Sequence, residues 1–225
     1  MPEILAIIPA RGGSKGIPQK NVRLIAGKPL IAYSIEAGKN ARMVSRVVVS
    51  TDDTEIAEVG KKYGAEIIMR PPELAEDKTP MDPVLRHVVE VLGREGYVPD
   101  AVVLLQPTSP LRTAAHVDGA IEKFLGNDVD SLISIFMIKN NRHEIMENNL
   151  LSPTFEKSKN RNERPSAIFE NGAIYISKTD LIKAGKIRGD KIGYYEMDQY
   201  SSVDIDELRD LVVAEQLLKI QDTLQ

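Results

Sequence analysis

The sequence contains no cysteine, and this absence excludes disulfide bonds, thiolate metal ligands and a cysteine nucleophile. Histidine is scarce as well. The three histidines lie far apart and form no HExxH or similar ligand pattern, so no zinc site is predicted. Because disulfides mark oxidising compartments, the composition fits a cytoplasmic protein, and no cationic segment precedes an apolar stretch as in a signal peptide.

Long apolar runs and excess positive charge are also missing. No run approaches the roughly 20 residues that span a bilayer, so no membrane segment is predicted. The net charge is −4 and the pI is about 5.5, whereas a nucleic-acid-binding protein favours a cationic surface. The chain is therefore expected to bind neither a membrane nor a nucleic acid.

Apolar runs that alternate with amphipathic segments indicate the fold class. Hydrophobic residues make up 42% of the chain and charged residues 28%, as in ordinary globular proteins. The runs lack clean alternation, which is typical of strands buried on both faces of a parallel sheet. We expect an α/β fold with a doubly wound, mostly parallel sheet. Strands are predicted at 4–8, 46–50, 66–69, 101–105 and 131–138, and helices at 54–63, 81–93, 114–125 and 207–220.

One polar region, residues 139–165, interrupts this alternation and has little periodicity. An insert of that length in a compact domain is usually functional or disordered. We see no repeat and no low-complexity linker, so the simplest division is a single domain, 1–225, that carries an inserted arm at about 139–165.

The first strand runs into the stretch "IIPARGGSKGIPQKN", residues 7–21. Residues 4–35 contain five cations and no acid, in a chain that is acidic overall. Glycines let backbone N–H groups approach an anion, and the cations neutralise its charge. The stretch matches neither GxxxxGK[ST] nor GxGxxG. It predicts a site for a phosphate-rich ligand such as a nucleoside triphosphate, and the alternative is a solvated turn with incidental lysines.

A second pattern is "VDID", residues 203–206. On an extended segment, side chains two apart share a face, so Asp204 and Asp206 can meet at one hard cation. The alternative is that Asp206 only caps the following helix, which leaves Asp204 unexplained. A similar pair, Asp52 and Asp53, precedes the predicted helix at 54–63, and we interpret it as cap and first-turn acids.

Several stretches together resemble the cytidylyltransferases that activate sialic acids and related nonulosonic acids. Acylneuraminate cytidylyltransferase, also called CMP-sialic acid synthetase, is the type member, and the family includes CMP-legionaminic and CMP-pseudaminic acid synthetases. The resemblance covers nearly the whole chain in order. The stretches are "IIPARGGSKGIPQKN", "VVVSTDDTEIAEVGKKYGAEIIMRPPELAEDKTP", "LLQPTSPLRTAAHVDGAI", "ENGAIYI" and "SSVDIDELRDLVVAEQLL".

The resemblance implies roles for individual residues. Arg11, Lys20 and Arg161 are expected to be catalytic cations, with Lys20 nearest the reacting phosphate. The implied nucleotide-binding set is Arg11, Gly12, Gly13, Ser14, Lys15, Lys20, Asn21, Arg70 and Thr79. The implied sugar-binding set is Gln106, Asn171, Gly172 and Arg161, and the implied ligands of Mg²⁺ (or Mn²⁺) are Asp204 and Asp206.

Some of these assignments keep an alternative. Arg70 can be a surface cation that closes a strand, and Met81 stands where some relatives carry a second hydroxyl. In the arm, Arg164 can replace Arg161 as the functional cation, because the segment "RNERP" departs from the family pattern. A disordered charged loop is the alternative for the whole arm.

The resemblance implies transfer of CMP from CTP to a nine-carbon sugar acid, with release of pyrophosphate. It also implies a homodimer in which the arm reaches the partner's active site. Two alternatives stay open, namely another sugar nucleotidyltransferase with a different nucleotide or acceptor, and a non-catalytic nucleotide-binding protein. A nucleic-acid-binding arm is disfavoured, because acids are interleaved among its cations.

Overall fold

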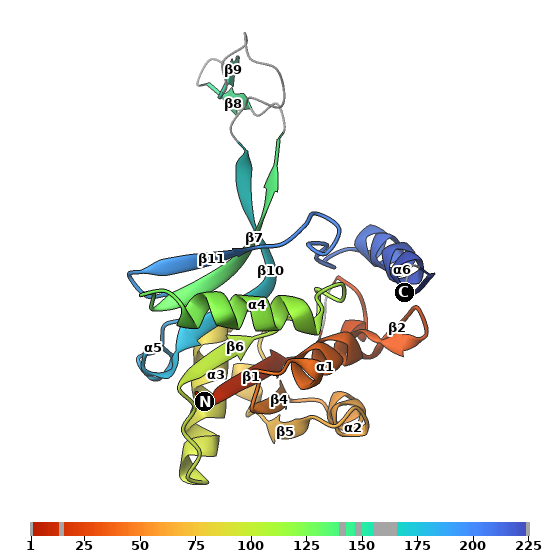
Figure 1. Cartoon of the computed structure of the whole chain (residues 1–225). Helices are drawn as coiled ribbons and strands as arrows, with labels where there is room; N and C mark the ends of the chain where they lie inside the picture. Colours follow the sequence, from red (N-terminus) through yellow and green to blue (C-terminus); the bar gives the residue numbers. More distant parts are fainter. Residues whose placement is uncertain (1, 14–15, 140–142, 147–149, 155–165, 224–225) are drawn as a thin grey trace.

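A seven-stranded sheet forms the centre of the molecule in the computed structural model (Figure 1). The structure describes residues 2–13, 16–139, 143–146, 150–154 and 166–223. Within them the strand order is β11-β7-β10-β6-β1-β4-β5. The strands are β1 (Ile4–Pro9), β4 (Arg46–Thr51), β5 (Glu66–Met69), β6 (Ala101–Leu104), β7 (Ser131–Ile138), β10 (Ala167–Lys178) and β11 (Ile192–Glu196).

Strand directions confirm the mostly parallel sheet. The pairs β1–β4, β1–β6, β4–β5 and β7–β11 are parallel, while β10 runs antiparallel to both β6 and β7. The sequence pattern did not predict β11, whose residues alternate between exposed and half-buried at the edge of the sheet. It also missed the short hairpin of β2 (Leu24–Ile25) and β3 (Lys28–Pro29).

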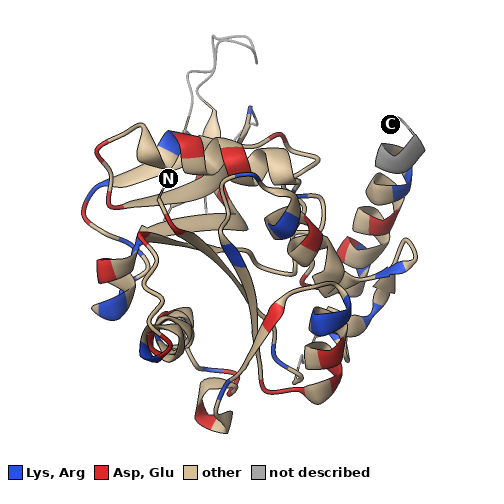
Figure 2. Cartoon of the chain, turned by 60° about the horizontal axis from the view of Figure 1, so that its bottom comes forward, with Lys and Arg blue, Asp and Glu red and all other residues tan. Residues whose placement is uncertain are grey.

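Helices cover both faces of the sheet, as a doubly wound fold requires. Ile4, Ala6 and Ile8 of β1 pack in one core with α1 (Leu30–Asn40), α2 (Thr54–Lys62) and α4 (Ala114–Leu125). The alternate residues Leu5 and Ile7 pack in the other core with α3 (Met81–Arg94) and α5 (Thr179–Lys183). The lysines, arginines and acids lie mainly on helices and loops (Figure 2), which agrees with strands buried on two faces.

The carboxyl ends of β1, β5 and β6 meet at one edge of the sheet, where open α/β folds bind ligands. The chain there continues into the segment with η1 (Lys20–Val22), the segment with η2 (Pro72–Leu74) and the turn before α4. The last helix, α6 (Leu208–Thr223), packs near this edge on a small third core that includes Ile17, Ile25 and Leu111. No helix in the described part of the chain is long and apolar enough to cross a membrane.

Beyond the sheet, β7 and β10 continue as a two-stranded ribbon (Figure 1). At its far end lies a short hairpin of β8 (His143–Ile145) and β9 (Leu151–Pro153). The described residues of the predicted arm therefore project from the sheet. The predicted cations Arg161 and Arg164 lie outside the described residues.

Candidate active site

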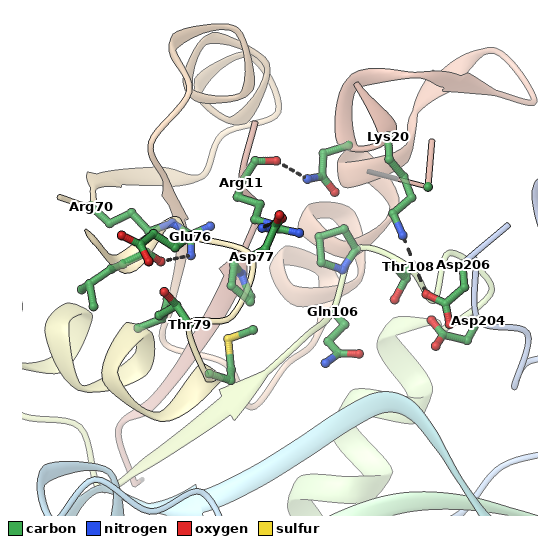
Figure 3. Close-up of a pocket in the computed structure, with 17 residues that line it drawn as sticks. Arg11, Lys20, Arg70, Glu76, Asp77, Thr79, Gln106, Thr108, Asp204 and Asp206 are labelled. Atoms are coloured by element: carbon green, nitrogen blue, oxygen red, sulfur yellow. Dashed lines mark hydrogen bonds and ion pairs between the residues drawn. The ribbon is translucent and has the colours of Figure 1, made fainter. Parts of the chain in front are cut away.

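Most of the predicted site residues line one cavity of about 440 Å³ at the carboxyl edge of the sheet (Figure 3). They are Arg11, Lys20, Asn21, Arg70, Thr79, Gln106, Asp204 and Asp206. The carboxyl ends of three strands and the segment before α6 supply them. The cationic loop and the late aspartates, almost 200 residues apart in sequence, therefore meet in one place.

Other predicted residues are placed differently. Ser14 and Lys15 lie outside the described residues, and a Cβ on Gly13 would meet no described atom within 4 Å. Asn171 is buried and does not line the cavity. Its side-chain oxygen accepts hydrogen bonds from the Ser134 hydroxyl (2.5 Å) and the Ala173 amide (3.1 Å), so it holds the bend of β10.

Two glycines of the first loop are required by close contacts. A Cβ on Gly12 would lie 2.5 Å from Oδ2 of Asp53, and a Cβ on Gly16 would lie 2.9 Å from the carbonyl oxygen of Asp206. The Gly12 amide also donates to Oδ1 of Asp52 (3.2 Å). Asp53 is the N-cap of α2, as predicted, because its carboxylate accepts from the Ile56 amide. Asp52 instead holds the loop after β1 through its hydrogen bond with Gly12.

Lys20 connects the first loop to the aspartate segment. Its Nζ donates to the carbonyl oxygen of Ile205 (2.8 Å) and lies 3.9 Å from Oδ1 of Asp206. The Lys20 side chain is 15% exposed, so its charge faces the cavity rather than open solvent. Nearby, the Asn21 side chain donates to the Arg11 carbonyl (3.0 Å) and fixes the backbone after β1.

Arg11 forms an ion pair with Asp77, which also lines the cavity. A bound triphosphate must therefore compete with this carboxylate for the guanidinium. The acidic stretch "AEDK", residues 75–78, is the signal in the sequence from which this partner could have been found. It lies within one of the stretches that resemble the family, but the resemblance implied no role for Asp77.

Arg70 and Thr79 lie at the opposite end of the cavity from Lys20 (Figure 3). Arg70 is 7% exposed, which excludes the alternative of a surface cation. One of its Nη atoms donates to the Leu74 carbonyl (3.2 Å), while its Nε has no partner among the described residues. Burial lowers the Arg70 pKa, and the charge of Arg11 adds to this effect. The Thr79 hydroxyl donates to the Glu73 carbonyl (3.0 Å).

Asp204 and Asp206 fit a divalent cation. Oδ1 of Asp204 is buried without a hydrogen-bond partner in the described residues, so this oxygen can bind a ligand at no cost in lost bonds. Burial raises the Asp204 pKa and the charge of Asp206 raises it further, whereas the Thr108 hydroxyl and Lys20 lower it. No three acidic, histidine or cysteine side chains converge in the described part of the chain, so a metal here needs further oxygens from water or a substrate.

The charges around the cavity support the same conclusion. Among the described lining residues, three cations face four carboxylates, so the formal charge of the lining is −1. The carboxylates are Glu76, Asp77, Asp204 and Asp206. One divalent cation turns the formal charge of this lining positive, which favours a triphosphate.

The cap at α6 does not involve the Asp206 side chain in the described hydrogen bonds. The Asp210 carboxylate accepts from the amides of Asp206 (3.1 Å) and Glu207 (2.8 Å). The Asp206 side chain is 78% exposed and points toward Lys20. Its carboxylate is therefore available for a cation.

A second cavity of about 460 Å³ adjoins the first and shares Met81 and Gln106 with it. Its other lining residues are Asp82, Leu104, Tyr175, Lys186, Ile187 and Arg188. Arg188 pairs with Glu170 (2.6 Å). Sequence reasoning missed Lys186 and Arg188, because they follow α5 in a loop without a motif.

Gly172 lies where β10 passes the border between the two cavities. Its φ of +72° is in the left-handed region, and a Cβ there would lie 3.0 Å from Oε1 of Gln106 and 3.7 Å from Oδ2 of Asp204. The glycine therefore leaves room for these two side chains, which is a different role from direct sugar contact.

Comparison with known proteins agrees with this geometry. The family model described as cytidylyltransferase matches residues 5–223. N-acylneuraminate cytidylyltransferase A of Danio rerio is 36% identical over 219 residues, which are 95% of this chain and 50% of that protein. The chain thus spans about half the length of this relative.

Other relatives match over nearly their whole length. Post-translational flagellin modification protein B of Campylobacter coli is 34% identical over 97% of this chain and 96% of its own. CMP-N,N'-diacetyllegionaminic acid synthase of Campylobacter jejuni subsp. jejuni is 34% identical over 99% and 97%.

Solved structures share the fold at low identity. CMP:2-keto-3-deoxy-manno-octonic acid synthetase complexed with CTP superposes with a TM-score of 0.72 at 18% identity, covering 97% of this chain and 99% of that one. A 4-diphosphocytidyl-2C-methyl-D-erythritol synthase from Anaerococcus prevotii gives a TM-score of 0.70 at 15% identity, covering 97% and 96%. With the match of the family model over almost the entire chain, these findings show that the chain belongs to the cytidylyltransferase family.

Proposed function

We propose that this chain transfers CMP from CTP to a nonulosonic acid. The acceptor's anomeric hydroxyl attacks the α-phosphate, the bond from that phosphorus to the bridging oxygen breaks, and pyrophosphate and a proton are released. The observation that carries the proposal is the meeting of Lys20 with Asp204 and Asp206 in a cavity that also contains Arg11. The name of one relative that matches over nearly its whole length, CMP-N,N'-diacetyllegionaminic acid synthase, supports a nonulosonic acid as acceptor.

The ends of the first cavity suit different parts of CTP. Arg70 and Thr79, with the nearby Leu74 carbonyl, offer donors and acceptors for the base and ribose. Lys20 and Arg11 suit the phosphates, because fixed cations stabilise charge that develops on phosphate oxygens during transfer. Asp204 and Asp206 would hold Mg²⁺, which supplies Lewis-acid stabilisation to the phosphate oxygens when bound.

The second cavity is proposed to bind the acceptor. It opens beside Gln106, whose amide can donate to a carboxylate or hydroxyl group. Lys186 and Arg188 supply positive charge at its wall, which matches the carboxylate of a sugar acid. The shared residues Met81 and Gln106 bring an acceptor in this cavity next to a nucleotide in the other.

A second copy of the chain is proposed to cover the arm. Large apolar side chains are exposed along the ribbon and its terminal hairpin, including Ile145 (78%), Leu151 (65%) and Ile168 (63%). Phe169 stacks on Phe136 with ring centroids 5.5 Å apart, yet remains 44% exposed. Apolar surface of this kind is typical of interfaces. This supports the proposed homodimer with an exchanged arm.

The test is pyrophosphate release from CTP, Mg²⁺ and a panel of nonulosonic acids. We expect release with at least one acid, and less with ATP, GTP or UTP. Light scattering on the same sample is expected to give twice the 24.9 kDa of one chain. If CTP raises the Tm of the protein but no acid gives pyrophosphate, the chain is a nucleotide-binding protein and the activity proposal is wrong.

Gly172→Ala is expected to lower turnover about 10- to 100-fold, because the new Cβ displaces the Gln106 side chain. The matched control is Gly96→Ala. Gly96 has a φ of +84° and no atom within 4 Å of the position that a Cβ would take, so both variants carry backbone strain of roughly 1–2 kcal/mol. Both variants are expected to lose the same amount of Tm. Only Gly172→Ala is expected to lose turnover. Equal turnover in both variants would show that the contact with Gln106 has no role.

A further inference from the structure

Arg112 is a buried cation to which the proposed reaction assigns no role. It lies at the end of the turn between β6 and α4 and is 2% exposed. Burial lowers its pKa to about 9, so it stays charged at neutral pH. In the described part of the chain no carboxylate pairs with it, and the cost of burying an unpaired ion is several kcal/mol. Such a residue needs a compensating role.

Within the described residues, the guanidinium donates to uncharged oxygens. One Nη donates to the carbonyl oxygens of Gln106 (3.2 Å) and Ser109 (3.1 Å), and the other donates to the Ser34 hydroxyl (2.5 Å). The Ser34 hydroxyl also donates to the Gln106 carbonyl (3.2 Å). Arg112 and α1 therefore fix the Gln106 backbone together.

The hydrogen bonds within the turn itself are weak. Its internal backbone bonds, from Ser109 to Gln106 and from Arg112 to Ser109, are both long at 3.4 Å. Pro107 and Pro110 have no amide hydrogen to donate. Charge-assisted bonds from Arg112 are stronger than these backbone bonds, so the side chain contributes more than they do to holding the turn in shape.

This turn touches both halves of the proposed site. Gln106 and Thr108 line the first cavity, and Gln106 also borders the second. The Thr108 carbonyl accepts from the amide of Ile205 (2.9 Å), the residue between the two metal-site aspartates. The Ile205 carbonyl in turn accepts from Lys20. A shift of the turn is thus passed to the aspartates and to Lys20.

We propose that Arg112 is a positioning residue for the transfer reaction. By holding the turn between β6 and α4, it fixes the positions of the Gln106 side chain and of the Asp204–Asp206 segment. The inference rests on the proposed function. The rival explanation is that Arg112 only stabilises the fold. Arg112→Met removes the guanidinium but leaves a long side chain in its place, so a fall in kcat of the folded variant with unchanged KM for CTP separates the two explanations.

The kinetic test compares Arg112→Met and Arg112→Lys with the wild type. We expect kcat to fall about 100-fold in Arg112→Met, as for a displacement of about 1 Å at a reacting centre. KM for CTP is expected to stay within about threefold, because Arg11 and Arg70 lie on other segments. Arg112→Lys keeps the charge but cannot reach three acceptors with a planar fork, so its kcat is expected to be intermediate.

The matched control is Asp118→Asn. Asp118 is a buried ion on α4 that accepts hydrogen bonds from the Arg42 and Met43 amides, away from both cavities. We expect it to lose Tm without a change in kcat. If Arg112→Met also keeps its kcat, the positioning role is wrong. Should Arg112→Met fail to fold, Ser34→Ala decides instead, since it removes one of the partners and is expected to lower kcat about tenfold.

Hydrogen exchange tests the inference without any turnover. In Arg112→Met we expect faster exchange at the amides of Ser109 and Ile205, and unchanged exchange there in Asp118→Asn. If exchange is faster in Arg112→Met but the wild type releases no pyrophosphate, the proposed function is wrong, whereas the positioning of the turn by Arg112 is supported. Unchanged exchange at both amides in Arg112→Met would show that Arg112 does not position the turn, even if the enzyme is active.

Discussion

Asp204→Asn is expected to abolish turnover while raising the Tm of the protein in the absence of metal. Loss of a metal ligand removes several kcal/mol of transition-state stabilisation, which corresponds to about 10³-fold or more in kcat. The wild-type carboxylate, by contrast, is expected to destabilise the fold. Its Oδ1 is buried without a partner among the described residues, and Asp206 repels its charge. If the substitution removes a cost on the order of 1 kcal/mol from the free energy of folding, Tm rises by roughly 2–4 °C in a chain of this size.

The Tm difference should depend on pH in a defined direction. The folded protein binds a proton at Asp204 more tightly than the unfolded chain, because burial raises the pKa above its ordinary 3.8. Above the raised pKa the carboxylate is ionised in both states and its cost is fully present. As pH falls from the raised pKa toward 3.8, the folded state takes up the proton and the cost disappears. The advantage of Asp204→Asn should therefore shrink over that interval.

Thermal scans of both proteins from about pH 7 to about pH 4, without metal, measure this effect. Asp180→Asn is the control, because that carboxylate side chain is 98% exposed and its removal should leave Tm unchanged. In the presence of CTP and Mg²⁺, the wild type should gain Tm and Asp204→Asn should gain less. A variant that loses Tm without metal and keeps its turnover would exclude Asp204 as the ligand.

The layered fold could be predicted because its strands are buried on both faces. Runs such as Ile4–Ile8 have apolar residues at every position, and the two residue sets enter different cores. Strands at the edge of the sheet were harder to predict from the sequence. In β11, Gly193 and Tyr195 are half-buried while their neighbours are exposed, so the run lacks the apolar density of a central strand. The antiparallel direction of β10 also follows from the ribbon it forms with β7, which no local pattern encodes.

The candidate site was predictable where chemistry is concentrated in a short stretch. Lys20 and Asp206 each belong to such a stretch, and the structure brings them within 3.9 Å. Residues that act through a neighbour left no such signal. Asp77 pairs with Arg11 across 66 positions, and Arg112 looks in the sequence like an ordinary cation before a helix. Only the packing of the turn between β6 and α4 shows that its guanidinium points inward.

Lys20→Met is expected to lower kcat about 10²- to 10³-fold, which corresponds to roughly 3–4 kcal/mol of transition-state stabilisation. The side chain is held in advance by the Ile205 carbonyl and lies beside Asp206, so its charge needs little reorganisation when the phosphates react. Loss of the bond to Ile205 should cost about 1 kcal/mol of stability, which leaves the protein folded. The control is Lys28→Met, since Lys28 pairs with Glu36 at the surface and lies outside both cavities.

Steady-state kinetics over a range of CTP concentrations separate the two ways in which Lys20 can act. If its charge matters mainly in the transition state, kcat and kcat/KM fall together in Lys20→Met. If it only binds the ground-state triphosphate, KM rises and kcat is retained, and the role proposed for Lys20 at the reacting phosphate is wrong. Lys20→Arg sharpens the distinction. A guanidinium keeps the charge but is longer and planar, so it cannot donate to the Ile205 carbonyl in the same geometry. We therefore expect it to restore CTP affinity more fully than kcat, because affinity needs the charge alone while transfer needs the charge at a fixed point.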